Sequence, residues 1–284
     1  MRRRASQAVL CFAILTGGAS VAFAQQRPLV TEDPEVIGTG RMLVEAGITY
    51  ERDTSFPASG LRGNLVRVPV AGVSVGLGSL IELQLDGAFH QRLVITDRHP
   101  AALSNRLNFS GDNTSSIDDF VLATKVRLAA ERPNRPAFGF RFATKLPNAS
   151  NEKGLGLDTI DFYSSLLVGK TVRSIRVVGN VGLGILSDPT NGTRQNDVLT
   201  VGGSLAKALT NDVELVGELN GHANTRSGTP PPGTESRAKM RIGGRFTRGT
   251  LRLDAGFLAG LTARDPNWGA TVGATYVWDA FNVP

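Results

Sequence analysis

The sequence predicts an all-β protein, a single antiparallel transmembrane β-barrel of about 12 strands with short periplasmic turns and longer extracellular loops. After residue 40, apolar and polar residues alternate in stretches close to the length that a tilted strand needs to cross a bilayer. The connections are alternately short and long, and the long ones are rich in Asp, Asn, Ser, Gly, Thr and Pro. A soluble β-sandwich would also alternate, but it would not require this regular asymmetry of connections.

The first half of the barrel is predicted from alternation and turn residues. In the first strand Met42, Val44 and Ala46 share one face. The third has the clearest pattern, with Ile81 and Leu83 opposite its acidic and amide side chains. The expected ranges are 41–50, 65–75, 81–90, 120–130, 138–146 and 159–170, and the segment 96–118 is the longest expected gap.

The second half continues the rhythm. A turn near 171–174 leads into the seventh strand, a turn at 210–212 joins the eighth to the ninth, and long polar loops cover 187–196 and 223–235. The expected ranges are 176–186, 198–208, 213–221, 237–244, 250–260 and 268–278.

The N-terminus predicts export through the general secretory route. Arg2, Arg3 and Arg4 precede an apolar run and the small-residue site Ala22-Phe23-Ala24, so residues 1–24 are a predicted signal peptide. The single cysteine, Cys11, lies in this leader, and a lipoprotein interpretation of it is the weaker alternative. Removing the leader takes away three of the 31 basic residues and none of the 25 acidic ones, so the net charge falls from +6 to +3. The high pI therefore does not argue for a nucleic-acid partner.

Three further ranges complete the expected organisation. Residues 25–40 contain two prolines and little alternation, so they form either a periplasmic lead-in or a plug in the lumen, and we prefer an extended tether. Residues 41–278 form the barrel, and residues 279–284 a C-terminal tail. The closing strand carries Thr271, Gly273, Tyr276 and Trp278, which resemble the insertion signal of bacterial outer-membrane barrels. Such signals usually end the chain, whereas here the tail follows.

Several short segments resemble a known bacterial family. They are Pro28 to Pro34, Gly38 to Arg41, Ser116 to Phe120, Lys145-Leu146-Pro147 and Glu218 to Gly221. The sequence is similar to the outer-membrane transporters labelled for the meta pathway of phenol degradation, and the similarity covers most of the chain after the leader. It implies an outer-membrane barrel that carries small, often aromatic or apolar, compounds.

Charged residues within the strands are expected to face the lumen. Four cations lie on adjacent strands, namely Lys125, Arg127, Arg141 and Lys145. We hypothesise that they form an anion-favouring constriction. Other charges are expected to form structural ladders across neighbouring strands. In these ladders Glu82 and Asp86 lie beside Lys125 and Arg127, and Glu214 and Glu218 beside Lys239 and Arg241.

Catalytic and metal sites are weakly indicated. His90, with Ser104 or Ser110 as a partner, is the best candidate for a lipid-modifying enzyme, but no nucleophile motif surrounds it. Asp33, Asp118 and Asp119 lack the spacing of a calcium loop, and no cysteine or close histidine pair indicates another metal. We expect no catalytic residue, metal or cofactor.

The functional expectation is a channel or facilitator for small molecules in the bacterial outer membrane. The alternatives are a structural or surface-interaction barrel with a closed lumen and, less favoured, a lipid-modifying enzyme. The expected partners are outer-membrane lipids, the barrel-insertion machinery and a small-molecule solute. The transported substrate, the openness of the lumen, a lateral or through-pore route and the oligomeric state stay open.

Overall fold

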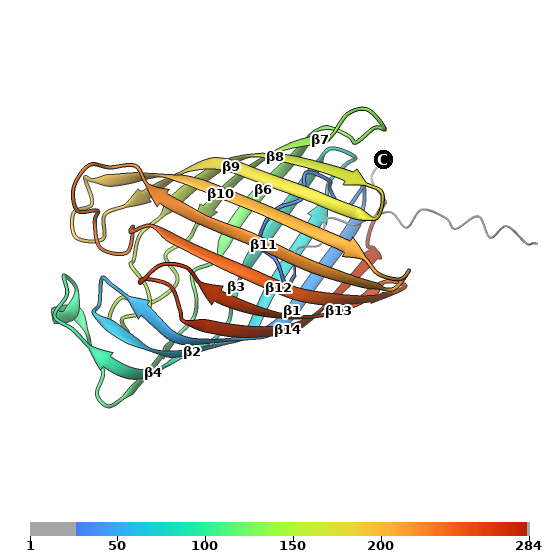
Figure 1. Cartoon of the computed structure of the whole chain (residues 1–284). Helices are drawn as coiled ribbons and strands as arrows, with labels where there is room; N and C mark the ends of the chain where they lie inside the picture. The colour runs from blue at the N-terminus through green and yellow to red at the C-terminus, as the bar shows by residue number, and fades with distance from the viewer. Residues whose placement is uncertain (1–26, 283–284) are drawn as a thin grey trace, which may run out of the picture.

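The strands close into one barrel (Figure 1) because β1 pairs on one side with β2 and on the other with β14. The computed structural model describes residues 27–282, so the predicted signal peptide, residues 25–26 and the last two residues lie outside it. A short 3-10 helix, η1, covers Ser104–Arg106. The strands are β1 (Arg41–Phe56), β2 (Leu61–Gly76), β3 (Ile81–Ala88), β4 (Gln91–Arg98), β5 (Asn113–Ser116), β6 (Val121–Ala129), β7 (Ala137–Lys145), β8 (Asp161–Val172), β9 (Ile175–Ser187), β10 (Gln195–Ala208), β11 (Val213–Asn224), β12 (Arg237–Arg248), β13 (Leu251–Gly260) and β14 (Trp268–Asp279).

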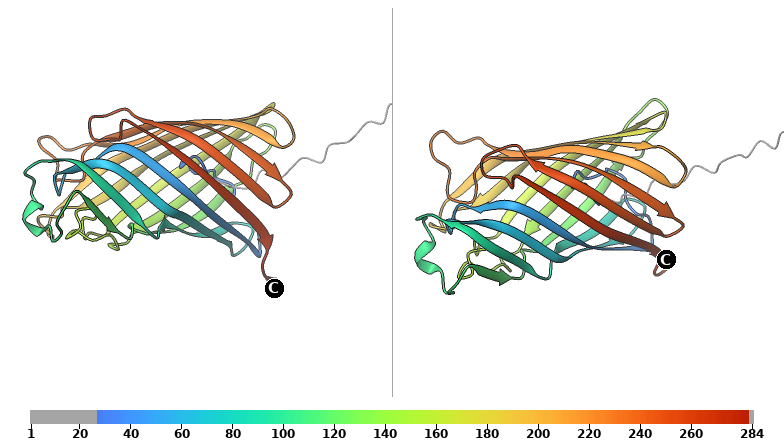
Figure 2. Two further views of the ribbon diagram at one scale, coloured as in Figure 1. Left: turned by 90° about the horizontal axis from the view of Figure 1, so that it is seen from below. Right: turned by 60° about the horizontal axis from the view of Figure 1, so that its bottom comes forward.

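The fourteen segments make a wall of twelve antiparallel strands. β3 and β4 both pair with β2, one after the other along its length. β6 pairs with β3 and β5 with β4, so β3 and β4 form the third strand of the wall and β5 and β6 the fourth. The prediction of a closed twelve-stranded barrel is therefore confirmed, and Figure 2 shows the tilted strands from two further sides.

The third strand is longer than the sequence predicts. Glu82 and Gln84 face inward before the break at 89–90, and Leu93 and Ile95 face inward after it. The inward residues have even numbers before the break and odd numbers after it, because the two residues between β3 and β4 interrupt the alternation. A strand predicted from continuous alternation therefore ends at His90, although the wall runs on to Arg98. The connection left between β4 and β5 is residues 99–112.

The two ends of the barrel differ in their connections. The turns β2–β3, β6–β7, β8–β9, β10–β11 and β12–β13 lie at one end, with the C-terminus, and the longer loops 99–112, 146–160 and 225–236 lie at the other. Short turns are periplasmic and long loops extracellular in bacterial barrels of this kind. The right end of Figure 1 is therefore the periplasmic end.

The outer face of the wall is apolar. Phe142 and Leu183 are both 57% exposed and point away from the lumen, as lipid-facing side chains do. Aromatic rings pair near both ends of β14, with Trp268 against Tyr50 of β1 and Tyr276 against Trp278. In the described part of the chain no helix is long and apolar enough to cross a membrane.

Candidate functional site

Residues 27–40, here called the luminal segment, lie inside the barrel. The backbone N–H groups of Val30 and Thr31 donate to the carboxylate of Glu218 on β11, at 3.1 and 2.8 Å. The amide of Asn180 on β9 accepts from the N–H of Glu32 and donates to its carbonyl. Wall side chains therefore satisfy backbone groups that a segment without secondary structure would otherwise leave unpaired.

The carboxylates of the luminal segment contact cations of β6, β7 and β9. Arg141 lies 2.9 Å from Glu32, and the buried ammonium of Lys125 lies 3.5 Å from the same side chain. The remaining two pairs are Asp33 with Arg176 at 2.7 Å and Glu35 with Arg127 at 2.8 Å. The segment is thus held by charge-assisted contacts to three neighbouring regions of the wall.

The apolar side chains of the luminal segment have matching inward positions on the wall. Leu29 packs against Ala206 and Val216, and Ile37 packs against Leu43 and Val277. These wall residues face the lumen, where an open channel would favour polar side chains. The wall sequence therefore offers apolar surface where the segment needs it.

Glycines make room for the two prolines of the luminal segment. A Cβ atom built on Gly256 of β13 would lie 2.9 Å from the Cβ of Pro28, and one on Gly139 of β7 would lie 3.1 Å from the Cα of Pro34. A real side chain at either place would push against the segment. The close approach thus depends on the missing side chains.

The contacts correct our preference for an extended tether over 25–40. Residues 27–40 lie in the lumen. The segment reaches the periplasmic end of the barrel at Gly40, which donates its N–H to the carbonyl of Gly76 at the end of β2. Within the described residues, every hydrogen bond between 27–37 and the wall involves a side chain, and none joins backbone to backbone. Sequence periodicity gave no indication of this placement because the segment is neither strand nor helix.

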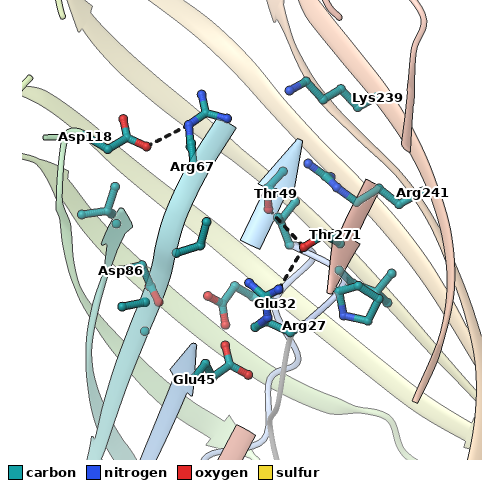
Figure 3. Close-up of a pocket in the computed structure, with 18 of the residues that line it drawn as sticks. Arg27, Glu32, Glu45, Thr49, Arg67, Asp86, Asp118, Lys239, Arg241 and Thr271 are labelled. Atoms are coloured by element: carbon teal, nitrogen blue, oxygen red, sulfur yellow. Dashed lines mark hydrogen bonds and ion pairs between the residues drawn. The ribbon is translucent and has the colours of Figure 1, made fainter. Parts of the chain in front are cut away.

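A chamber of about 560 Å³ lies between the luminal segment and the extracellular half of the wall. Figure 3 shows most of its acids in the lower part of the view and most of its cations in the upper part, although Arg27 lies among the acids and Asp118 lies beside Arg67. Thr49 and Thr271 lie between the groups, and Arg27 donates to Thr271 at 2.9 Å. The acids Glu32, Glu45 and Asp86 lie below the two threonines in this view, and the cations Arg67, Lys239 and Arg241 lie above them.

An ionic bridge crosses the extracellular side of the chamber. Arg67 of β2 lies 3.1 Å from Asp118 and 3.0 Å from Glu51 of β1. The other oxygen of Glu51 accepts from Lys239 of β12 at 2.8 Å, across the inside of β13 and β14. The bridge separates the chamber from a second cavity of about 220 Å³, because Arg67, Glu51 and Lys239 line both.

The second cavity lies under the extracellular loops. Leu65 and Leu93 point inward from β2 and β4 and form a buried cluster with Leu155 of loop 146–160, against which Leu107 and Phe109 of loop 99–112 pack. Two of the long loops are therefore anchored inside the barrel mouth.

A third cavity, of about 240 Å³, lies on the other side of the luminal segment. Thr31 and Glu32 form one wall, and the polar side chains Asn180, Thr200 and Asn220 form part of the opposite one. The segment thus divides the lumen, because the chamber and this cavity share Val30 and Glu32.

Each cation of the predicted basic patch has a carboxylate partner. Lys125, Arg127 and Arg141 contact the luminal segment, and Lys145 lies 2.9 Å from Asp161 and 3.2 Å from Asp119. The strand-three acids alone do not account for this neutralisation. The segment residues Glu32 and Glu35 supply most of it, and sequence reasoning missed them.

The predicted ladders are present in part. Glu82 is the register partner of Lys125, at 3.3 Å, and Glu218 is that of Arg241, at 2.6 Å. Two expected neighbours differ, because strand register and bulges set the partner. Asp86 lies 3.8 Å from Arg141 and not beside Arg127, and Glu214 faces Arg245, whereas Lys239 reaches Glu51.

The remaining candidates take structural positions. Thr271, Gly273, Tyr276 and Trp278 lie on β14, which pairs with β1, and their role as an insertion signal stays a prediction. The chain runs on beyond this predicted signal, and the N–H of Ala280 donates to the carbonyl of Gly40.

The residues weighed for catalysis lie apart from one another. His90 is exposed at the break between β3 and β4, and Ser104 donates to the carbonyl of Ser59. No hydrogen bond joins His90 to Ser104 or Ser110 among the described residues. In the same part of the chain, no group of three or more His, Cys, Asp or Glu residues could hold a metal ion.

The closed barrel, its lipid-facing exterior and its asymmetric ends define a bacterial outer-membrane β-barrel protein. Residues 25–278 match the family model described as "Putative MetA-pathway of phenol degradation", and the chain belongs to this family. No curated protein sequence matches this chain.

Solved structures of other outer-membrane proteins share the fold. An outer membrane channel from Pseudomonas putida F1 is 12% identical, with a TM-score of 0.61 over 87% of this chain and 98% of that one. The NanC porin is 8% identical, with a TM-score of 0.51 over 83% of this chain and 98% of that one.

Proposed function

We propose that this protein is an outer-membrane channel for small molecules, including compact aromatic compounds, and that the luminal segment closes its periplasmic half. The chamber between the segment and the ionic bridge is the observation that carries the proposal. A purely structural barrel needs no internal space of this size. A channel through this lumen needs such a space, together with displacement of the luminal segment.

The lining of the chamber suits a small amphipathic solute. Val70, Val121 and Leu258 supply apolar surface, while Thr49 and Tyr163 supply hydroxyl groups. Such a mixture accommodates an aromatic ring and hydrogen-bonds a polar substituent. The family description names phenol degradation, which supports phenol as the first solute to test.

A reversible disulfide between the luminal segment and the wall tests the channel. A Cβ on Gly139 would lie 3.1 Å from the Cβ of Pro34, slightly closer than the roughly 3.5–4.5 Å typical of disulfides. The one cysteine of the sequence, Cys11, lies in the predicted leader, so the Pro34→Cys/Gly139→Cys barrel would carry a single cysteine pair.

The readouts are single-channel conductance in planar bilayers and phenol-driven swelling of liposomes. We expect the oxidised protein to be silent and the reduced protein to show discrete openings and faster swelling. The Pro34→Cys single variant is the control, because it should conduct in both redox states. A folded barrel, verified by heat-dependent gel mobility, that stays silent after reduction would contradict the channel.

The second candidate is a structural or surface-interaction barrel with a closed lumen. It is favoured by the ion pairing of the lumen, where each cation of the predicted basic patch already contacts a carboxylate. The disulfide experiment separates the two functions, because a structural barrel would be silent in both redox states. A lipid-modifying enzyme would instead lose hydrolysis on His90→Ala.

A further inference from the structure

Four wall cations from three strands line the periplasmic half of the lumen, where all of them contact the luminal segment. Lys125 and Arg127 come from β6, Arg141 from β7 and Arg176 from β9, and we call them the basic strip. Arg141 lines the chamber. Arg127 and Arg176 lie near the periplasmic ends of their strands, so the strip extends from the chamber toward the periplasm.

The luminal segment provides carboxylates to every member of the strip. Arg141 and Lys125 contact Glu32, Arg176 makes two hydrogen bonds to Asp33, and Arg127 contacts Glu35. The wall itself supplies fewer close carboxylates to these cations. Lys125 keeps Glu82 and Arg176 keeps Glu131, but Asp86 lies 3.8 Å from Arg141.

Arg127 depends most on the segment. Glu35 is its one ion-pair partner among residues 27–282, and its other contact is the carbonyl of Ser79. If the segment left, Arg127 would keep the carbonyl of Ser79, and Arg141 would keep the amide oxygen of Gln84 at 2.8 Å, but neither would retain a close carboxylate partner. Cations set in a low-dielectric wall attract anions strongly, because little water screens them.

We propose that the basic strip is a binding track for small carboxylates and that the luminal segment occupies it as an internal competitor. The inference rests on the proposed channel function, whose solutes would use the track. The chemistry follows from the present occupant, since carboxylates fill the strip and Arg176 holds one in a bidentate pair. The adjoining chamber has room for a ring, so an aromatic carboxylate fits both parts.

Benzoate and benzyl alcohol are the matched probes, because they share a ring and differ in charge. Their affinity is measured by isothermal titration on the refolded full-length barrel in detergent micelles. The test variant is Glu32→Gln/Asp33→Asn/Glu35→Gln, which removes the competing charges. The control is Asp112→Asn/Glu152→Gln/Asp158→Asn, which removes three exposed charges from extracellular loops.

We expect the test variant to bind benzoate about tenfold tighter than the wild type, a change of about 1.4 kcal/mol. The control variant should match the wild type, and benzyl alcohol should bind all three proteins alike. Adding Arg127→Gln/Arg141→Gln to the test variant should abolish the gain. Heat-dependent gel mobility establishes that each barrel is folded.

Equal benzoate affinity in the test variant and the wild type would overturn the track, as would an equal gain for benzyl alcohol. The titration needs no conductance, so its outcome is separate from that of the disulfide experiment. Tight benzoate binding in a barrel that never conducts would remove the channel and keep the binding site.

Discussion

The carboxylate of Asp33 and the guanidinium of Arg176 face each other as a bidentate pair, with N–O distances of 2.7 and 2.8 Å. The two residues are 143 positions apart in the sequence, and their side chains are 23% and 14% exposed. The pair fixes the centre of the luminal segment to β9. Arg176 also contacts Glu131 in the turn between β6 and β7, so segment, turn and strand share one ionic cluster.

The Asp33–Arg176 pair should contribute measurably to stability. A double-mutant cycle of Asp33→Ala and Arg176→Ala, followed by urea unfolding in vesicles, should give a coupling energy of about 1–2 kcal/mol, because both groups are largely removed from water. The coupling should fall little between low and high salt. A coupling near zero would mean that the segment leaves the lumen in the folded protein.

A side chain at Gly256 should displace the luminal segment. In Gly256→Val the new Cβ would lie 2.9 Å from that of Pro28, so we expect more frequent openings in planar bilayers and an intact barrel. Gly179→Val is the matched control, because a Cβ at Gly179 meets nothing within 4 Å. Equal conductance of the two variants would show that the segment does not limit permeation.

The buried cluster at the mouth should hold the extracellular loops. Leu65→Ala removes a fully buried side chain and should cost about 2–5 kcal/mol, with faster trypsin cleavage at Arg106 in loop 99–112. Leu199→Ala, on the lipid face and 38% exposed, should leave cleavage unchanged. Similar cleavage of both variants would mean that Leu65 does not anchor the loop.

Alternation predicted the barrel well because it reports directly on which face of a strand meets lipid. The twelve wall strands, the outward Phe142 and the inward Arg141 all follow from a period of two. The break at 89–90 was missed because two residues there change the parity of inward positions while the wall continues.

The partners of the lumen charges could not be predicted in the same way. Periodicity assigns Lys239 to the lumen, but only the closed geometry brings it to Glu51, on a strand far away in the sequence. Glu51 itself continues the inward series of the first strand and could have been found by extending that series past Tyr50. The acids Glu32 and Glu35 gave no periodic signal, although acidic residues before a barrel rich in inward cations are a usable indication.

The way the luminal segment is held separates closure of the lumen from construction of the barrel wall. Its contacts over residues 27–37 involve side chains, so the hydrogen-bond ladders of the wall are complete without it. On the proposed channel function, a substitution such as Glu35→Gln would change how often the lumen opens, while the backbone hydrogen bonds of the membrane-embedded sheet stay the same. Permeability could then change by substitution in the segment without any change in the strand pairing of the wall.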